Sequence, residues 1–243
     1  MPFDVKEYEY HRVTRDRVEL STEPVTVERQ VTLVINGVPR IQLMASPSDL
    51  EELGYGVMLS SGIVFSKHHV RSIRVSGNEI LVDIDGLEGG GDPSHRFVSD
   101  VGIGSDLAFT ISPEYVFQSL EHLETETYRS TSGAHSATIL DADCRILARG
   151  VDAGRHNAYD KAIGKAFLMD IDLRKSVLLA SGRQSAEMVS KAVNAGIPIV
   201  ISKAAPISSG IDAAREAGLT LICFADHGKF SVFSGIERIH SLP

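Results

Sequence analysis

Alternating hydrophobic and polar positions dominate the first part of the chain, a pattern that is typical of strands with one buried face. An apolar run at residues 31–35 is followed by Asn36 and Gly37, and a second run covers residues 38–44. Asn-Gly accepts the positive φ angles of a tight hairpin turn, so we expect two antiparallel strands here. Pro39 cannot donate a hydrogen bond to a neighbouring strand, which places the second strand at an edge or at a bulge.

A helical repeat interrupts the strands over residues 50–58, where apolar side chains share one helix face. Ser46 or Ser48 is expected to cap this helix, and the acidic residues of its first turn suit the positive end of the helix dipole. A second hairpin is predicted around residues 76–78, which are Ser-Gly-Asn. Residues 86–106 are rich in Gly, Ser and Asp and are expected to form a mobile loop or linker.

In the second half, short and fully apolar runs alternate with helical stretches. Strands are predicted at residues 135–140, 144–150, 176–180, 197–202, 219–225 and 230–233, and helices at residues 112–122, 157–169, 185–195 and 208–217. Apolar strands that alternate with helices indicate a sheet covered on both faces. We therefore predict an α/β fold, with a smaller N-terminal α+β domain over residues 20–112 and a larger domain over residues 113–243.

The composition is that of a soluble globular protein. Of 243 residues, 43% are hydrophobic and 23% are charged, which excludes a disordered tail protein and a coiled coil. No run approaches the ~20 apolar residues of a membrane span, and the first ten residues lack the apolar run of a secretory signal, so we expect a cytoplasmic protein. Cys144 and Cys223 are too few and too far apart for a disulfide scaffold or a zinc knuckle.

The charge is unevenly distributed along the chain. Its net value of −8 argues against general nucleic-acid binding, which needs a strongly basic face. Residues 1–112 hold 10 basic and 17 acidic side chains, whereas residues 145–203 hold 10 basic and 5 acidic ones. The basic stretch favours an anionic ligand in the second half, and chance clustering on a solvated face is the alternative.

The densest group of polar side chains lies at a predicted strand-to-helix junction. It comprises Asp152, Arg155, His156, Asn157, Asp160 and Lys161. If Asn157 is the helix N-cap, the free N–H groups behind it and the Arg155 guanidinium can bind a phosphate or a carboxylate. The alternative is structural, with an Arg155–Asp160 ion pair and with His156 satisfied inside the junction.

Two further strand-to-helix junctions have the same character. The first holds Ser181, Gly182, Arg183 and Ser185, and the second holds Lys203 together with several serines. Ligands of α/β sheets bind at the carboxyl ends of the strands, so three such junctions together favour an anion-binding edge of the sheet.

Other kinds of site find little support. His68 and His69 lack a carboxylate or a cysteine at a metal-ligating spacing, and the glycines at residues 89–91 lack the Lys and Ser/Thr of a P-loop. A zinc deaminase needs His-x-Glu and a later Cys-x-x-Cys, but His135 is followed by Ser-Ala and no such cysteine pair exists. The sequence shows no nucleophile–base pair of the kind that a nucleotide hydrolase needs. We therefore expect no zinc.

Three stretches together carry a resemblance to one known family. They are GAHSA at residues 133–137, VDAGRHNAYDKAIG at residues 151–164 and SGRQSAEMVSK at residues 181–191. The chain resembles the FdhD-type formate dehydrogenase accessory proteins, the sulfurtransferases of the FdhD/NarQ family, over about residues 20–240. The resemblance implies a cytidine-deaminase-like, three-layer α/β half without zinc, and a homodimer.

The same resemblance implies a role in molybdenum cofactor biosynthesis. Such proteins accept persulfide sulfur from a cysteine desulfurase and pass it to a molybdenum or tungsten bis-molybdopterin guanine dinucleotide, the cofactor of formate dehydrogenase. The resemblance assigns the contact with the guanine dinucleotide to Phe224, Ala225, Asp226, His227, Gly228 and Lys229, although the family carries arginine where this chain has Asp226. These residues, His135 and the three junctions form the predicted cofactor-binding site.

The chain departs from the family at its sulfur carrier, a Cys-Gly-x-Cys pair. Val101 and Gly104 occupy the two cysteine positions here. Neither residue can form a persulfide, so we expect the chain to bind the cofactor without carrying sulfur itself. The alternative function is that of a non-catalytic chaperone, which holds the molybdenum cofactor or the apo-dehydrogenase.

Overall fold

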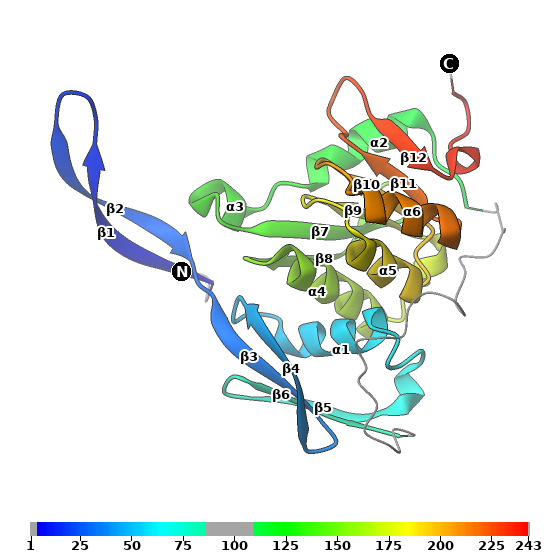
Figure 1. Cartoon of the computed structure of the whole chain (residues 1–243), viewed down its shortest axis with the longest axis horizontal. Coiled ribbons are helices and arrows are strands. Elements are labelled where there is room, and N and C mark those ends of the chain that lie inside the picture. Colours follow the sequence, from blue (N-terminus) through cyan, green and yellow to red (C-terminus); the bar gives the residue numbers. More distant parts are fainter. Residues whose placement is uncertain (1–3, 86–108, 243) are drawn as a thin grey trace.

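The computed structural model describes residues 4–85 and 109–242. These residues form a two-stranded ribbon, a four-stranded sheet and a six-stranded sheet, with helices packed between and around the two larger sheets (Figure 1). The α/β fold predicted from the sequence is confirmed. The predicted loop at residues 86–106 lies outside the described residues. None of the described helices is long and apolar enough to cross a membrane.

The four-stranded sheet lies in the first unit and has the order β4-β3-β6-β5. Its strands are β3 (Arg29–Ile35), β4 (Val38–Ala45), β5 (Val70–Ser76) and β6 (Glu79–Ile84). Both predicted hairpins are confirmed, and β4 is an edge strand whose pairing with β3 shifts register next to Pro39. Helix α1 (Leu50–Ser60) covers one face of this sheet and buries Leu53, Val57 and Met58 against it.

The predicted cap of α1 is wrong. Asp49 is the N-cap residue, in a left-handed conformation with φ of 52°, and no side chain caps the helix. The Ser48 hydroxyl donates instead to the Asp4 carboxylate. The backbone N–H of Ser46 donates to Asp152 over 2.9 Å. The loop before α1 is therefore held by contacts with distant parts of the chain rather than by a cap.

The six-stranded sheet of the second unit has the order β12-β11-β10-β9-β7-β8. Its strands are β7 (His135–Leu140), β8 (Ile146–Asp152), β9 (Val177–Ala180), β10 (Ile199–Ser202), β11 (Thr220–Cys223) and β12 (Ser231–Ser234). Strands β9, β10 and β11 run parallel, and the other pairings are antiparallel.

Helices cover both faces of this sheet, as the apolar strands predict. One face packs against α4 (Arg155–Leu168), α5 (Ala186–Asn194) and α6 (Ser208–Ala217). The other face packs against α2 (Pro113–Ser119), which Ser112 caps and which continues as a 3₁₀ turn to His122. The short helix α3 (Glu126–Thr131) then leads into β7. The second unit therefore has three layers.

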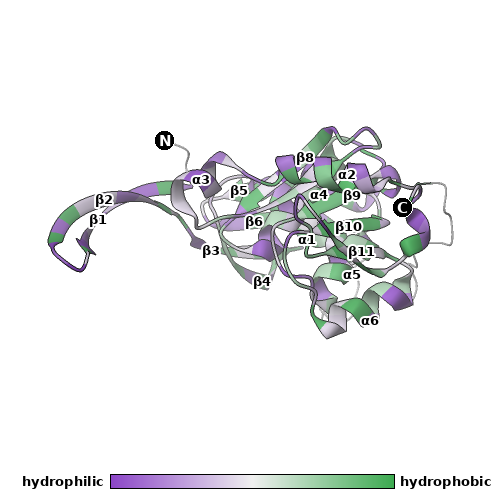
Figure 2. Cartoon of the chain, turned by 90° about the horizontal axis from the view of Figure 1, so that it is seen from above, coloured by the Kyte–Doolittle hydropathy of each residue, from purple (hydrophilic) through white to green (hydrophobic). Residues whose placement is uncertain are grey.

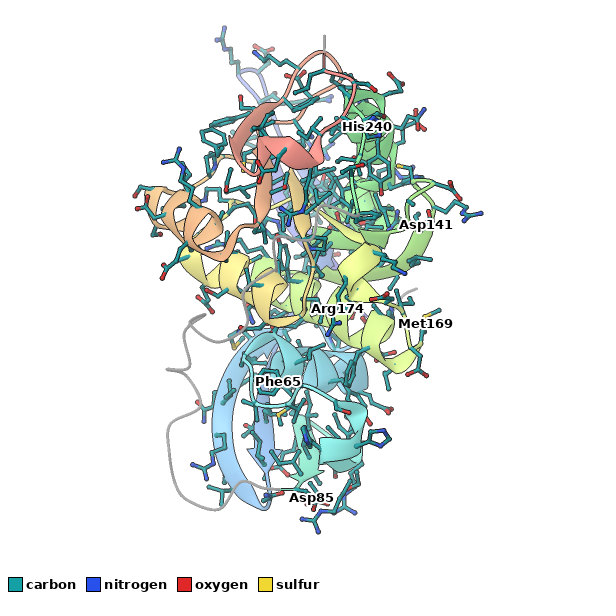
Figure 3. All side chains as sticks on the ribbon, turned by 90° about the vertical axis from the view of Figure 1, so that its right-hand side faces the viewer. Phe65, Asp85, Asp141, Met169, Arg174 and His240 are labelled. Carbon is teal, nitrogen blue, oxygen red and sulfur yellow. The ribbon has the colours of Figure 1, made fainter. Side chains whose placement is uncertain are left out.

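The two units meet where α1 packs on α4. Glycines allow a very close approach, because a Cβ atom at Gly56 would lie 1.8 Å from the Asp160 carbonyl oxygen. A Cβ atom at Gly164 would lie 1.9 Å from the carbonyl oxygen of Glu52. Figure 3 shows Phe65 close to the boundary between the units. Backbone-to-backbone packing of this kind makes the two units one packed body.

The two-stranded ribbon is an element that the sequence analysis missed. Strands β1 (Val5–Val13) and β2 (Val18–Thr26) pair along their whole length and project away from the body (Figures 1 and 2). We call this hairpin the arm. Asp4 holds its base through Ser48, and Thr26 Oγ1 lies 2.8 Å from the Thr131 hydroxyl on α3. Residue 20, the expected start of the first domain, lies within β2.

Candidate functional site

The site is built at the carboxyl ends of the three parallel strands. The loops that follow β9, β10 and β11 are linked there by backbone hydrogen bonds. Lys203 N–H donates to the Ala180 carbonyl, and Phe224 N–H donates to that of Ala204. The Ser202 hydroxyl donates to the Gly182 carbonyl over 2.8 Å. The prediction that the residues after β9 and those after β10 lie together at one edge of the sheet is confirmed.

His135 joins this edge because β7 runs antiparallel to β9. Its Nδ1 atom lies 3.0 Å from the Ser181 hydroxyl, which also accepts a hydrogen bond from the Ser136 N–H over 3.0 Å. Burial lowers the pKa of His135, the positive charge of Arg155 lowers it further, and the Asp152 carboxylate opposes both. His135 is therefore a neutral hydrogen-bonding group near pH 7, fixed by Ser181.

Two adjoining pockets open along this edge. The larger has a volume of about 950 Å³ and is lined by Leu120, Glu121, Leu123, Glu124, Arg129, Lys203, Phe224, Ala225, Asp226, His227, Lys229 and Ser231. The smaller has a volume of about 550 Å³ and is lined by Leu123, Glu124, Tyr128, Ser132, Gly133, Ala134, His135, Ser136, Ala153, Ser181, Lys203 and Ala204. Lys203 lines both pockets and carries the cation at their junction. We call the two together the groove.

Residues 224–229 form one end of the groove. Phe224 has a φ of 53°, an uncommon value for an aromatic residue, and the residue is 46% exposed. The Asp226 carboxylate accepts hydrogen bonds from the N–H groups of Gly228 and Lys229, both at 2.8 Å, and these bonds lower the pKa of Asp226. The turn therefore places an aromatic ring and an anion at the same end of the groove.

Arg155 and His156 lie in the first turn of α4. The Arg155 stem packs over Gly182, where a Cβ atom would lie 2.9 Å from that of Arg155. The His156 Nδ1 atom lies 3.3 Å from the Glu187 carboxylate. That carboxylate raises the pKa of His156, but burial lowers it by more, so the pKa lies below its ordinary value. Arg183 is exposed and Ser185 is the N-cap residue of α5, without a side-chain cap bond.

The other polar residues of the first junction lie between the two units. Asn157 is not the N-cap of α4, because the helix begins one turn earlier after Gly154. Its amide donates to the Met44 carbonyl at 2.6 Å and to Asp152 at 2.9 Å. The Lys161 ammonium lies 2.7 Å from the Asp152 carboxylate, and both side chains are fully buried. These three side chains bind α4 to the first unit.

Asp160 makes a second buried ion pair beside the first. It pairs with Lys191 on α5 at 2.8 Å and accepts a hydrogen bond from the Ser60 hydroxyl at 2.6 Å. The alternative prediction of an Arg155–Asp160 ion pair is wrong. Asp152, Asn157, Asp160 and Lys161 therefore contact protein partners and line neither pocket.

The two cysteines are also interior residues. Cys144 is buried at the turn between β7 and β8, and burial raises its pKa to about 11. Cys223 is buried at the end of β11, and burial raises its pKa to about 12. A thiolate is the reactive form of cysteine, so neither side chain is placed to accept sulfur. Val101 and Gly104 lie outside the described residues.

Several residues of the site carry no recognisable signal in the sequence. Gln184 is fully buried and holds the loop after β9, accepting from the Tyr159 hydroxyl at 2.7 Å and donating to the Gly182 carbonyl at 2.8 Å. The opposite wall of the groove, which includes Glu124 and Arg129, belongs to the segment around α3. That segment was not among the candidates because nothing in its local pattern places it beside β10.

Comparison with known proteins supplies the family context. The model of the FdhD/NarQ family matches residues 26–240. A protein named "Sulfur carrier protein FdhD" from Wolinella succinogenes is 32% identical, over 97% of this chain and 89% of its own length. Another of that name from Methanothermobacter thermautotrophicus is 34% identical, over 96% of this chain and 98% of its own length.

A solved structure shows the same fold. It is that of a formate dehydrogenase accessory protein from Desulfotalea psychrophila, with a TM-score of 0.88 and 23% sequence identity. The match covers 97% of this chain and 99% of the other, a share that includes most of the arm.

Proposed function

The chain belongs to the FdhD/NarQ family, and from this premise we propose that it is a formate dehydrogenase accessory protein that binds molybdopterin guanine dinucleotide in the groove. The observation that carries the proposal is the position of Lys203 at the junction of the two pockets. Its ammonium can hold the pyrophosphate, with the guanosine end towards Phe224 and the pterin end towards His135 and Ser181. A dinucleotide is long enough to need both pockets.

Three helix ends support the binding of an anion near this edge. α4, α5 and α6 each begin after a strand, and none of them has a side-chain cap bond at its N-terminus. Uncapped first turns make this edge of the sheet electropositive, although the first-turn residues of the three helices line neither pocket and act on a bound phosphate only from a distance. The larger pocket also holds the cations Arg129 and Lys229, while the acids Glu121 and Asp226 line it away from the smaller pocket, and Glu124 lines both pockets beside Lys203.

The sulfur step distinguishes this chain from its relatives. A persulfide forms when a thiolate takes a sulfur atom from the persulfide of a donor protein, which regains its own thiolate. The cysteine positions of the family hold Val101 and Gly104, and both remaining cysteines are buried with raised pKa values. We infer that the chain presents the cofactor while another protein supplies the sulfur-bearing cysteine, which makes it a binding chaperone.

The partners of the proposal follow from the family. Formate dehydrogenase receives the cofactor, a cysteine desulfurase is the source of the sulfur, and a second copy of the chain completes a cytoplasmic homodimer. Complementation of a strain without its own accessory protein tests this role. Rescue of formate dehydrogenase activity supports the presence of another protein that carries the sulfur in that strain. If no such protein is present, we expect this chain to give no rescue, and a family member with the cysteine pair to restore the activity.

Calorimetry with GDP tests the groove. Lys203→Ala should weaken GDP binding roughly tenfold or more, because a hydrogen bond to a charged group contributes about 1.5–3 kcal/mol. Lys175→Ala is the matched control, since Lys175 is 78% exposed on its side chain and lies outside both pockets. Equal affinities for the two variants, or no binding by the wild-type protein, would contradict the assignment.

Intact-mass measurement tests the sulfur inference. After incubation with a cysteine desulfurase, cysteine and pyridoxal phosphate, the protein should keep its original mass. The gain of one sulfur atom, lost again in the Cys144→Ala variant, would show that this cysteine carries sulfur and would overturn the chaperone function.

A further inference from the structure

Tyr128 is an exposed aromatic residue on the wall of the smaller pocket. It lies on α3 and is 42% exposed. Within the described part of the chain, its hydroxyl makes no hydrogen bond and its ring contacts no other ring. An aromatic face that stays uncovered beside a pocket is suited to stack on a flat ligand.

Helix α3 is held at both ends, so the backbone of Tyr128 is in place before a ligand binds. The Thr125 hydroxyl caps the helix by accepting from the Tyr128 N–H at 3.2 Å, and the Ser132 N–H donates to the Tyr128 carbonyl at 2.7 Å. Thr131 lies against Thr26 at the base of the arm, with 2.8 Å between their hydroxyl oxygens. Restraint of this kind lowers the ordering cost of binding.

The lining of the smaller pocket differs in charge from that of the larger one. Among the described residues that line it, only Glu124 and Lys203 are charged, and both also line the larger pocket. The side chains that belong to the smaller pocket alone are neutral, and they include the Ser136 and Ser181 hydroxyls and the His135 imidazole. This lining offers no second cation to a further phosphate and suits an uncharged, flat group with polar atoms along its edge.

We propose that Tyr128 is the stacking surface for the second heterocycle of the ligand, the pterin, at the opposite end of the groove from Phe224. The inference rests on the proposed function, because it takes the pyrophosphate to lie at Lys203 and the guanosine to lie in the larger pocket. It makes the smaller pocket a selective one. The groove then prefers a dinucleotide with an aromatic group beyond the pyrophosphate to GDP or to a GDP-linked sugar.

Two guanosine pyrophosphates separate the contribution of the second ring. Diguanosine diphosphate has a second guanine beyond the pyrophosphate, and guanine shares with pterin a pyrimidinone ring that carries an amino group. GDP-mannose has the same pyrophosphate charge but carries a sugar without an aromatic face in that place. In calorimetry, the wild-type protein should bind diguanosine diphosphate roughly tenfold more tightly than GDP-mannose, because one base stacked on an aromatic side chain contributes about that factor or more.

Replacement of Tyr128 tests the residue itself. Tyr128→Ala and Tyr128→Leu should each lose roughly tenfold in affinity for diguanosine diphosphate, because neither offers an aromatic face, and both should bind GDP as the wild-type protein does. Tyr128→Phe keeps the ring and should keep the affinity for both ligands. Tyr8→Ala is the matched control, since Tyr8 is 49% exposed on the arm and lines neither pocket, and it should change neither affinity.

The GDP titrations separate this inference from the proposed function. If GDP binds but Tyr128→Ala leaves the affinity for diguanosine diphosphate unchanged, the stacking role is overturned and the groove assignment stands. The same holds if GDP-mannose binds as tightly as diguanosine diphosphate, if Tyr128→Leu keeps the full affinity, or if Tyr128→Ala weakens GDP binding equally. If no guanine nucleotide binds to the wild-type protein, the proposed function fails and the stacking role fails with it.

Discussion

Replacing Lys161 by methionine removes one partner of the fully buried pair with Asp152. The two groups lie 2.7 Å apart with no exposed side-chain surface. Removal of one partner from a buried ion pair leaves the other charge unpaired and costs about 3–5 kcal/mol. Asp152 keeps neutral donors at Ser46, Gly154 and Asn157, which places the expected loss at the lower end of that range.

Lys165 offers a matched control on the same helix. Its ammonium also lies 2.7 Å from a carboxylate, that of Asp49, but the two side chains are 30% and 31% exposed. An exposed pair contributes about 0–1 kcal/mol, so Lys165→Met should change the free energy of unfolding by less than that. The distance and the helix are the same, so the contrast reports burial together with the hydrogen bonds that Lys161 donates to the carbonyls of Ser46 and Val151.

Denaturant unfolding of both variants measures the difference. Lys161→Met should lower the free energy of unfolding by several times more than Lys165→Met. The double variant Lys161→Met/Asp152→Asn should recover part of the loss, since it removes the unpaired charge. Equal losses at the two lysines, or no recovery in the double variant, would refute the assignment of Asp152 and Lys161 as a buried structural pair.

Three further predictions follow from burial and packing. The pKa of His135 lies below its ordinary value of 6.5. The contribution of the neutral side chain to stability is therefore complete above pH 6.5 and is lost as the pH falls through the lowered pKa. His135→Asn should remove this loss, so that the free energy of unfolding falls less steeply with decreasing pH. Gly56→Ala should destabilise the protein by roughly 1–3 kcal/mol through overpacking, whereas Gly228→Ala, whose nearest contact is at 3.5 Å, should stay within ~0.5 kcal/mol in the same denaturant assay. Cys144 and Cys223 should react slowly with a thiol reagent at pH 8 in the native protein and rapidly in denaturant; fast native labelling would contradict their burial.

Local chemistry determined most of what the sequence could predict about the fold. The Asn36-Gly37 turn and the apolar strands of the second half each depend on residues that are neighbours in sequence, and both are confirmed. The arm was missed because the alternation of apolar and polar residues within it is brief and its apolar side chains, such as those of Val18 and Leu20, are exposed rather than buried. A strand without a buried face leaves no hydrophobic signal.

The site was only partly predictable for a related reason. Lys203 and Ser181 follow predicted strands, so the rule for strand ends placed them at the groove, whereas Phe224 was assigned to the site by the family resemblance. The true partners of Asp160 and Lys161 could not be read from the sequence, because Ser60 and Ser46 are 100 and 115 residues away. A cluster of charged residues has the same appearance in a binding site and in a packed interface until those partners are known.

During synthesis, the first unit leaves the ribosome well before the helix on which it rests. The Ser60–Asp160 separation of 100 residues corresponds to roughly 5–20 s of translation at about 5–20 residues per second. Until α4 emerges, the Gly56 face of α1 has no backbone to pack against, and Ser46 has no carboxylate to bind. The first unit can pair its strands early but completes its structure only with the second, so folding of this chain finishes late and the two halves depend on one another in time as well as in space.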